Sequence, residues 1–378
     1  MKHHIACLSV LFLFGAIADA FVLPPRSCMT CPSQREMNML PISGEDAALM
    51  TRSQLLDNTL AYPLGFAAAF RTGAAISVIN QPQMPPITSC IGSTVWRLPS
   101  GARVRLFYPT EETSLSDNTM APYCTDGRQT SNGMARMVGF RQVGLDFLLA
   151  HLANASSGCI QDAPIGNSSE KKDLPLLIYS HGYGGNMDMA TYFLRTMASK
   201  GMIVAAVEHT DGTASSTVLP DGRERKFNEY LMTGRQQLTR RASELLEAVD
   251  YLPKKLEQEY STTISSCFLG GHSYGAPSAV MAANGASENV NVDGLILHDP
   301  ALGMGYGMLP PNGSKSKIPT ISYISDEYNR ANVRYGDLTL HVKGCFHGNF
   351  VDAPLWAPRF VMRTLSLVIP AAGPARPM

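Results

Sequence analysis

Short apolar runs recur along the chain from about residue 100 onward. The first run, "RVRLFYP", alternates like a strand, whereas most of the later runs are apolar at consecutive positions. Runs of the second kind are typical of strands that are covered on both faces, as in a parallel sheet. We expect strands over residues 103–109, 174–182, 202–209, 267–273, 294–300, 319–325 and 338–344.

Segments with helical spacing lie between these strands. Residues 186–201 end in Lys200 and Gly201, a basic last turn followed by a glycine cap. Residues 233–252 carry an apolar stripe at helical spacing, and residues 276–285 form a third helical segment. Strands that alternate with helices predict an α/β fold with a mostly parallel, doubly wound sheet and flanking helices.

The charge balance excludes some classes of partner. Lys plus Arg total 31 and Asp plus Glu total 31 in 378 residues. This balance offers no basic footprint, so we expect no nucleic-acid partner. We also expect no transmembrane segment, because the most apolar internal stretch, 64–79, is interrupted by Arg71 and two glycines.

The N-terminus predicts a targeting sequence. Residues 1–20 have the pattern of a signal peptide, with a weakly basic start, the apolar run "IACLSVLFLFGAIA" and a small-residue cleavage site. We interpret residues 21–95 as a leader or N-terminal extension and residues 96–378 as the catalytic domain. Phe21, followed by "VLPP", also resembles the start of plastid presequences in algae with complex plastids, which would make 21–85 a transit peptide. Secretion is our favoured localisation, and the plastid is the alternative.

The cysteines and sequons fit an oxidising compartment. Of the eight cysteines, one lies in the predicted signal peptide, which leaves an odd number and predicts one to three disulfides. Cys28 and Cys31 form a CxxC pair, but no second pair or histidine pair at zinc spacing accompanies it. Asn-x-Ser sequons at Asn154, Asn167 and Asn312 lie in polar stretches and predict a glycoprotein.

The stretch "GGHSYGAPSA" carries the candidate nucleophile. Ser273 stands in a Gly-x-Ser-x-Gly pattern between a predicted strand and a predicted helix. A nucleophile elbow requires this strand–turn–helix context, and Gly271 and Gly275 keep bulk out of the tight turn. The pattern alone also fits a structural turn serine, but the context favours an α/β-hydrolase fold with Ser273 as nucleophile.

A serine nucleophile needs a general base, which in this fold lies C-terminal to it. His298 lies within a predicted strand, and His341 lies inside the strand "LTLHV", where a sheet-face histidine is the ordinary explanation. His347 follows that strand in the loop "GCFHGNF". The base must lie in such a loop, so we predict His347.

The acid and the oxyanion hole come from other strand ends. Asp299 and Asp326 each close a predicted strand, and spacing alone leaves both open as the group that orients the histidine. The backbone N–H of Tyr274 is one expected oxyanion donor. The other is the N–H of Tyr183 in the loop "SHGYGGN", whose glycines let the backbone approach the substrate.

Four segments resemble the platelet-activating factor acetylhydrolase family of secreted and cytosolic type II lipases: "LPLLIYSHGYGGN", "KGMIVAAVEHTDGTASST", "FLGGHSYGAPSAV" and "HGNFVDAP". The resemblance runs over residues 100–355 and places the nucleophile on Ser273, the histidine on His347 and the acid on Asp299. The segment "LHDPALGMGY" departs from the family's usual Leu-Asp-Ala, which keeps Asp326 as an alternative. Tyr-Gly-Ala after the serine departs from the family's Phe-Gly-Gly and leaves the acyl preference open.

The resemblance implies a calcium-independent esterase that needs no metal and no organic cofactor. Its substrate would be a short or oxidised acyl ester at the sn-2 position of a platelet-activating-factor-like phospholipid, met at a lipid surface. One alternative is a general carboxylesterase or a chlorophyllase-like plastid esterase on the same fold. Another is a catalytically dead hydrolase used for binding, which would be expected to lack a triad member.

Overall fold

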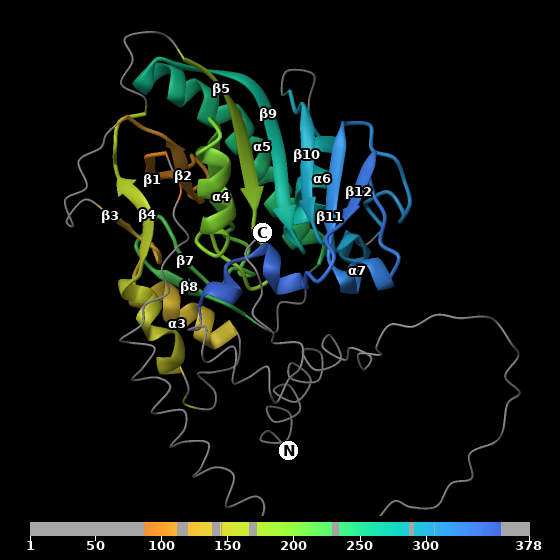
Figure 1. Ribbon diagram of the computed structural model, residues 1–378, viewed down its shortest axis with the longest axis horizontal. Coiled ribbons are helices and arrows are strands. Elements are labelled where there is room, and N and C mark those ends of the chain that lie inside the picture. Colours follow the sequence, from red (N-terminus) through yellow and green to blue (C-terminus); the bar gives the residue numbers. More distant parts are fainter. Residues whose placement is uncertain are drawn as a thin grey trace, which may run out of the picture.

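The computed structural model describes residues 87, 89–111, 120–137, 144, 146–165, 172–228, 234–286, 291–305 and 307–356 (Figure 1). Its strands are β1 (Ile91–Arg97), β2 (Arg103–Pro109), β3 (Met120–Pro122), β4 (Ser156–Gln161), β5 (Lys172–Ser180), β6 (Ile203–Glu208), β7 (Ser216–Val218), β8 (Glu224–Lys226), β9 (Thr262–His272), β10 (Gly294–His298), β11 (Thr320–Ile324) and β12 (Leu338–His341). Its α-helices are α3 (Arg128–Met137), α4 (Thr191–Ala198), α5 (Arg235–Tyr260), α6 (Gly275–Asn284) and α7 (Asp326–Arg330). Short 3-10 helices are η3 (Asp146–Asn154), η4 (Leu302–Gly305), η5 (His347–Phe350) and η6 (Ala353–Leu355).

Ten strands form one sheet in the order β12-β11-β10-β9-β5-β6-β2-β1-β4-β3. The six strands from β12 to β6 run parallel to their neighbours. β2 pairs antiparallel with β6, and β1 pairs antiparallel with β2. The predicted mostly parallel sheet is therefore confirmed. The end that begins with β2 is mainly antiparallel, although β1 and β4 pair in parallel there.

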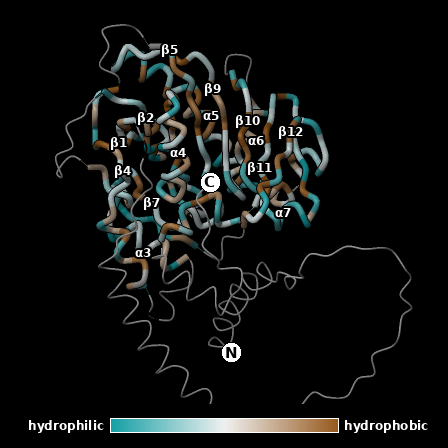
Figure 2. Tube along the Cα trace, in the orientation of Figure 1, coloured by the Kyte–Doolittle hydropathy of each residue, from teal (hydrophilic) through white to brown (hydrophobic). Residues whose placement is uncertain are grey.

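Helices cover both faces of the sheet, and the central strands supply apolar side chains to both. On β5, Leu176 and Ile178 pack in one core with residues of α5 and α6, whereas Leu177 and Tyr179 pack in a second core with α4. Successive side chains of a strand point to opposite faces, so a strand covered on both sides must be apolar throughout. Figure 2 shows hydrophobic positions gathered along the central strands and the helices that cover them. Each fully buried Leu or Ile stabilises the fold by about 1.5–3 kcal/mol.

The sheet starts earlier than the sequence predicts. The boundary expected between residues 95 and 96 falls inside β1, which pairs with β2 from Ile91↔Pro109 to Arg97↔Arg103. A hydrophobic pattern misses this strand because some of its buried residues are polar. Ser93 can be buried there because it accepts a hydrogen bond from the buried guanidinium of Arg105. The predicted signal peptide and transit peptide lie outside the described residues.

The expected disulfides do not appear among the described cysteines, which are free thiols: Cys90, Cys124, Cys159, Cys267 and Cys345. Cys28 and Cys31 lie outside the described residues. Within the described part of the chain, no helix is both long enough and apolar enough to span a membrane.

Candidate active site

The candidate site is built from loops that follow four parallel strands. Ser273 follows β9, Asp299 follows β10, the loop with Tyr183 follows β5, and His347 begins η5 shortly after β12. Because these strands run in one direction, their carboxyl ends meet at the same edge of the sheet. In Figure 1 the dark blue segment that contains η5 and η6 lies at that edge, next to the ends of β5 and β9.

The turn at Ser273 has the backbone of a nucleophile elbow. Ser273 has a φ of 55°, a left-handed conformation that costs a non-glycine residue on the order of 1–3 kcal/mol. Its N–H donates to the carbonyl oxygen of His298 at 2.9 Å, which ties the turn to β10. A Cβ on Gly275 would overlap the carbonyl of Ser180, and one on Gly271 would overlap the backbone of Gly275. Both glycines are therefore required by close backbone packing.

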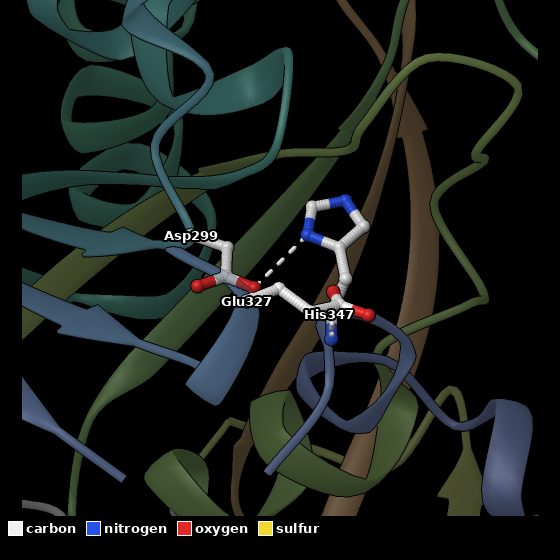
Figure 3. Close-up of side chains that lie close together, drawn as sticks. All are labelled: Asp299, Glu327 and His347. Carbon is white, nitrogen blue, oxygen red and sulfur yellow. Dashed lines mark hydrogen bonds and ion pairs between the residues drawn. The ribbon is translucent and has the colours of Figure 1, made fainter. Parts of the chain in front are cut away.

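Asp299 and His347 form a hydrogen-bonded pair beside this turn, in which Asp299 is buried and His347 is half-buried. The Oδ2 of Asp299 lies 3.0 Å from Nδ1 of His347, as Figure 3 shows, and the Asp299 side chain is fully buried. Its Oδ1 accepts a second hydrogen bond, from the N–H of Ser325 at 2.7 Å. A carboxylate held in this way keeps the proton of His347 on Nδ1 and leaves Nε2 free to accept a proton.

The other two histidines after the elbow have different surroundings. His341 Nε2 lies 2.6 Å from Asp326 Oδ1, so Asp326 contacts His341 instead of His347. His298 is buried within the sheet, and its Nδ1 lies 2.8 Å from the hydroxyl of Tyr179. Burial lowers the pKa of His298 to about 3, so it is neutral near pH 7. The geometry therefore favours Asp299 over Asp326 as the partner of His347.

Ser273 and His347 both line one cavity of about 150 Å³. The rest of its wall is mainly apolar, and includes Tyr179, Met187, Met189, Ala190, Leu194 and Val207. Among the described residues no hydrogen bond joins the Ser273 hydroxyl to the His347 ring. Such bonds are often long in an enzyme without substrate and shorten in the complex.

Tyr328 packs against both Ser273 and His347. Its ring stacks on that of His347, with centroids 5.3 Å apart and planes 4° from parallel. Burial and the nearby charges of Asp299 and Glu327 raise the pKa of Tyr328, and hydrogen bonding with the Ser273 side chain opposes that rise. The stacked ring limits the orientations that the His347 imidazole can adopt.

The two predicted oxyanion residues lie against each other. The rings of Tyr183 and Tyr274 meet edge to face, with centroids 6.4 Å apart. A Cβ on Gly182 would lie 3.1 Å from Cβ of Ser273, so this loop runs directly beside the nucleophile turn. The structure thus brings both residues to the same place, and their role as donors stays a prediction.

The sequence did not single out Glu327 and Asp352, which hold the loop that carries His347. Glu327 Oε2 accepts a hydrogen bond from the backbone N–H of His347 at 3.2 Å. The buried Asp352 accepts hydrogen bonds from the Tyr192 N–H and the Tyr123 hydroxyl, both at 3.1 Å. Burial raises the pKa of Asp352 to about 7. Asp352 lies in the segment "HGNFVDAP", which could have drawn attention to it.

Asp299, Glu327 and His347 place one ligand atom each within 4.8 Å of one another, a spacing that could hold a cation (Figure 3). The Nδ1 of His347 is, however, already hydrogen bonded to Asp299. Calcium prefers six to eight oxygen ligands, and this group offers two carboxylates and one nitrogen. The arrangement fits an oriented histidine better than a calcium site.

Comparison with known proteins gives related sequences and a related fold. The family model described as "Platelet-activating factor acetylhydrolase, isoform II" matches residues 88–258, a segment that includes Tyr183 and ends before Ser273. The platelet-activating factor acetylhydrolase of Canis lupus familiaris is 30% identical over 117 residues, which are 31% of this chain and 25% of that protein. The protein of the same name from Cavia porcellus is 24% identical over 307 residues, 70% of this chain and 66% of that protein.

Among solved structures, a ferulic acid esterase from Streptomyces cinnamoneus superimposes with a TM-score of 0.50 and 23% identity, over 71% of this chain and 78% of that one. This likeness shows the fold, and the predicted α/β-hydrolase fold is confirmed. The match to the Canis lupus familiaris protein, and the match to the platelet-activating factor acetylhydrolase of Bos taurus, each span 25% of the relative's length.

Proposed function

Because the chain belongs to the platelet-activating factor acetylhydrolase family, we propose that it is a carboxylic ester hydrolase that cleaves the sn-2 acetyl ester of platelet-activating-factor-like phospholipids without calcium. One observation carries the proposal. Ser273, in a left-handed turn, shares a cavity with His347, whose Nδ1 is hydrogen bonded to the buried Asp299. This arrangement supports Ser273 as the nucleophile, His347 as the base and Asp299 as the acid of a serine esterase.

The reaction follows from the roles of these groups. The Oγ of Ser273 attacks the ester carbonyl while Nε2 of His347 takes its proton, and Asp299 stabilises the imidazolium. The N–H groups of Tyr183 and Tyr274 donate to the oxyanion. His347 then gives its proton to the leaving oxygen, and lyso-phospholipid departs. Water, deprotonated by His347, attacks the acyl-enzyme, and His347 returns that proton to Oγ of Ser273 as the bond to the acyl carbon breaks and the carboxylic acid leaves.

The cavity favours a short acyl group. At about 150 Å³ with a mainly apolar wall, it suits an acetyl or short oxidised chain better than a long fatty acyl chain. A substrate panel tests this. We expect hydrolysis of platelet-activating factor at least 100-fold faster than that of a long-chain phosphatidylcholine, and unchanged rates with a calcium chelator. Preference for a pheophorbide ester, or loss of activity with the chelator, would contradict the proposal.

We also propose that the protein is secreted and that its signal peptide is cleaved after residue 20. A plastid location is the alternative. Sequencing the N-terminus of the mature protein separates the two. A mature chain that begins at Phe21 supports secretion. A mature chain that begins near residue 86 contradicts it and supports a transit peptide.

A further inference from the structure

A buried arginine lies beneath the candidate oxyanion hole. Arg241 of α5 is 0% exposed. Its Nη1 donates to the carbonyl oxygen of His181 at 2.6 Å, and this residue lies two positions before Tyr183. Its Nε donates to Asp211 at 2.9 Å in a buried ion pair, which balances its charge. A guanidinium can make several such bonds at fixed angles, which a lysine cannot.

The same guanidinium also holds a second segment. Its Nη2 donates to the hydroxyl of Thr213 at 2.6 Å. The carbonyl oxygen of Thr213 accepts the N–H of Gly184 at 2.8 Å, and the carbonyl of Gly185 accepts the N–H of Ser215 at 2.8 Å. The backbone on both sides of Tyr183 is therefore tied, directly or through Thr213, to one side chain.

Arg241 contacts the other predicted oxyanion residue as well. Its guanidinium carbon lies 4.9 Å from the ring centroid of Tyr274, a cation–π contact in a buried place. Building on the proposed function, we infer that Arg241 is a positioning residue that fixes both oxyanion donors, those of Tyr183 and Tyr274, relative to Ser273. Oxyanion stabilisation depends on preorganised donors, so a shift of either residue weakens binding of the transition state more than binding of substrate.

The test compares three variants. Arg241→Met removes the donors at similar volume, and Thr213→Val removes one hydroxyl while the Arg241–Asp211 pair stays. Arg240→Met is the matched control, because Arg240 is the neighbouring arginine on α5 and its side chain is 53% exposed. For each variant we would measure kcat and KM on a short-chain ester, the inhibition constant of a trifluoromethyl ketone that forms a tetrahedral adduct, and the thermal midpoint.

We expect Arg241→Met to lower kcat on the order of 100-fold and to change KM by less than about threefold, since one lost oxyanion donor lowers kcat by roughly 100- to 1,000-fold. Trifluoromethyl ketone affinity should fall by the same factor as kcat/KM. Thr213→Val should lower kcat and the affinity for the ketone by about threefold to tenfold each, and Arg240→Met should leave both quantities unchanged. Should Arg241→Met not fold, Thr213→Val decides the matter.

Two results would overturn the inference. One is a wild-type kcat and wild-type ketone affinity in folded Arg241→Met or Thr213→Val. The other is a loss of kcat with ketone affinity unchanged. Ser273→Ala, measured beside them, separates this inference from the proposed function. If Ser273→Ala stays fully active, the proposed function fails; if it is inactive while folded Arg241→Met has wild-type kcat and ketone affinity, only the positioning role of Arg241 fails.

Discussion

Replacing Asp299 by asparagine changes one oxygen of a fully buried side chain into an NH2 group. In the native site, Asp299 accepts hydrogen bonds at both oxygens, from the Ser325 N–H and from His347 Nδ1. Asparagine has one acceptor, so it can satisfy only one of these two donors. If its oxygen stays with Ser325, its NH2 faces His347 and forces the imidazole proton onto Nε2. In that tautomer His347 cannot accept the proton of Ser273.

The expected loss in kcat is about 10⁴-fold, which corresponds to about 5.5 kcal/mol of transition-state stabilisation. Asp326→Asn is the matched control, because Asp326 also follows a strand and also contacts a histidine, His341, at 2.6 Å. Its side chain is 28% exposed, and an ion pair of that kind contributes about 1 kcal/mol or less. We expect its kcat to stay within about tenfold of the native value.

The assay is steady-state hydrolysis of a chromogenic acetyl ester and of platelet-activating factor, with circular dichroism to show that both variants fold. If Asp326→Asn loses activity and Asp299→Asn keeps it, the acid is Asp326 and our account of the site is wrong at that position. If both variants stay active, no carboxylate orients His347 during the reaction.

Three further predictions follow from the same geometry. His347→Ala should abolish turnover of the ester, whereas His341→Ala should mainly lower the thermal midpoint; the reverse pattern in folded variants would refute the choice of base. Gly275→Ala should destabilise the protein in urea unfolding by about 1–3 kcal/mol or more, because the new Cβ would overlap a backbone carbonyl, whereas Gly303→Ala, with nothing within 4 Å, should have little effect. The free energy of unfolding should include the full contribution of neutral His298 above pH 6.5 and should lose it as the pH falls towards 3. The reason is that His298 has a pKa of about 3 in the folded protein, so the unfolded chain takes up the proton first. At pH 4 the loss is about 3 kcal/mol, and a His298→Gln variant with the same acid dependence of unfolding would contradict it.

The strands that are buried on both faces could be predicted from the sequence, because their apolar runs leave little choice of environment. All seven predicted strands appear, as β2, β5, β6, β9, β10, β11 and β12. The prediction ended one helix at residue 252, next to Pro253, but α5 continues to Tyr260. Leu252 and Leu256 are both fully buried, so the apolar stripe on one face continues past the proline and holds the helix together.

The antiparallel end of the sheet beyond β2 could not be predicted in the same way. Its core contains a charged group, since Arg105 is 1% exposed and pairs with the buried Asp188 at 2.6 Å. Polar residues such as Ser93 and Ser157 are buried there beside hydrogen-bond partners. A pattern based on hydrophobicity treats such residues as exposed, and β1 and β4 were missed for that reason, whereas β3 is only three residues long.

In the candidate site, too, some residues could be predicted from the sequence and others could not. Residues in a local motif, such as Ser273 with its flanking glycines, could be proposed from the sequence because the turn itself demands them. The choice between Asp299 and Asp326 could not, since it depends on which histidine each carboxylate meets across the sheet edge. Arg241 was missed because the sequence does not distinguish it from the adjacent Arg240. Only the packing of α5 shows that the Arg241 side chain is buried and the Arg240 side chain is exposed.

The central claim is that Ser273 forms the acyl-enzyme, and covalent labelling tests it most directly. The native protein and Ser273→Ala would be treated with a fluorophosphonate, digested and examined by mass spectrometry while residual esterase activity is followed. Our account predicts one equivalent of label on the peptide that contains Ser273, loss of activity in step with labelling, and an unlabelled, inactive but folded Ser273→Ala variant. Stoichiometric label on another residue, or esterase activity that survives in Ser273→Ala, would contradict it.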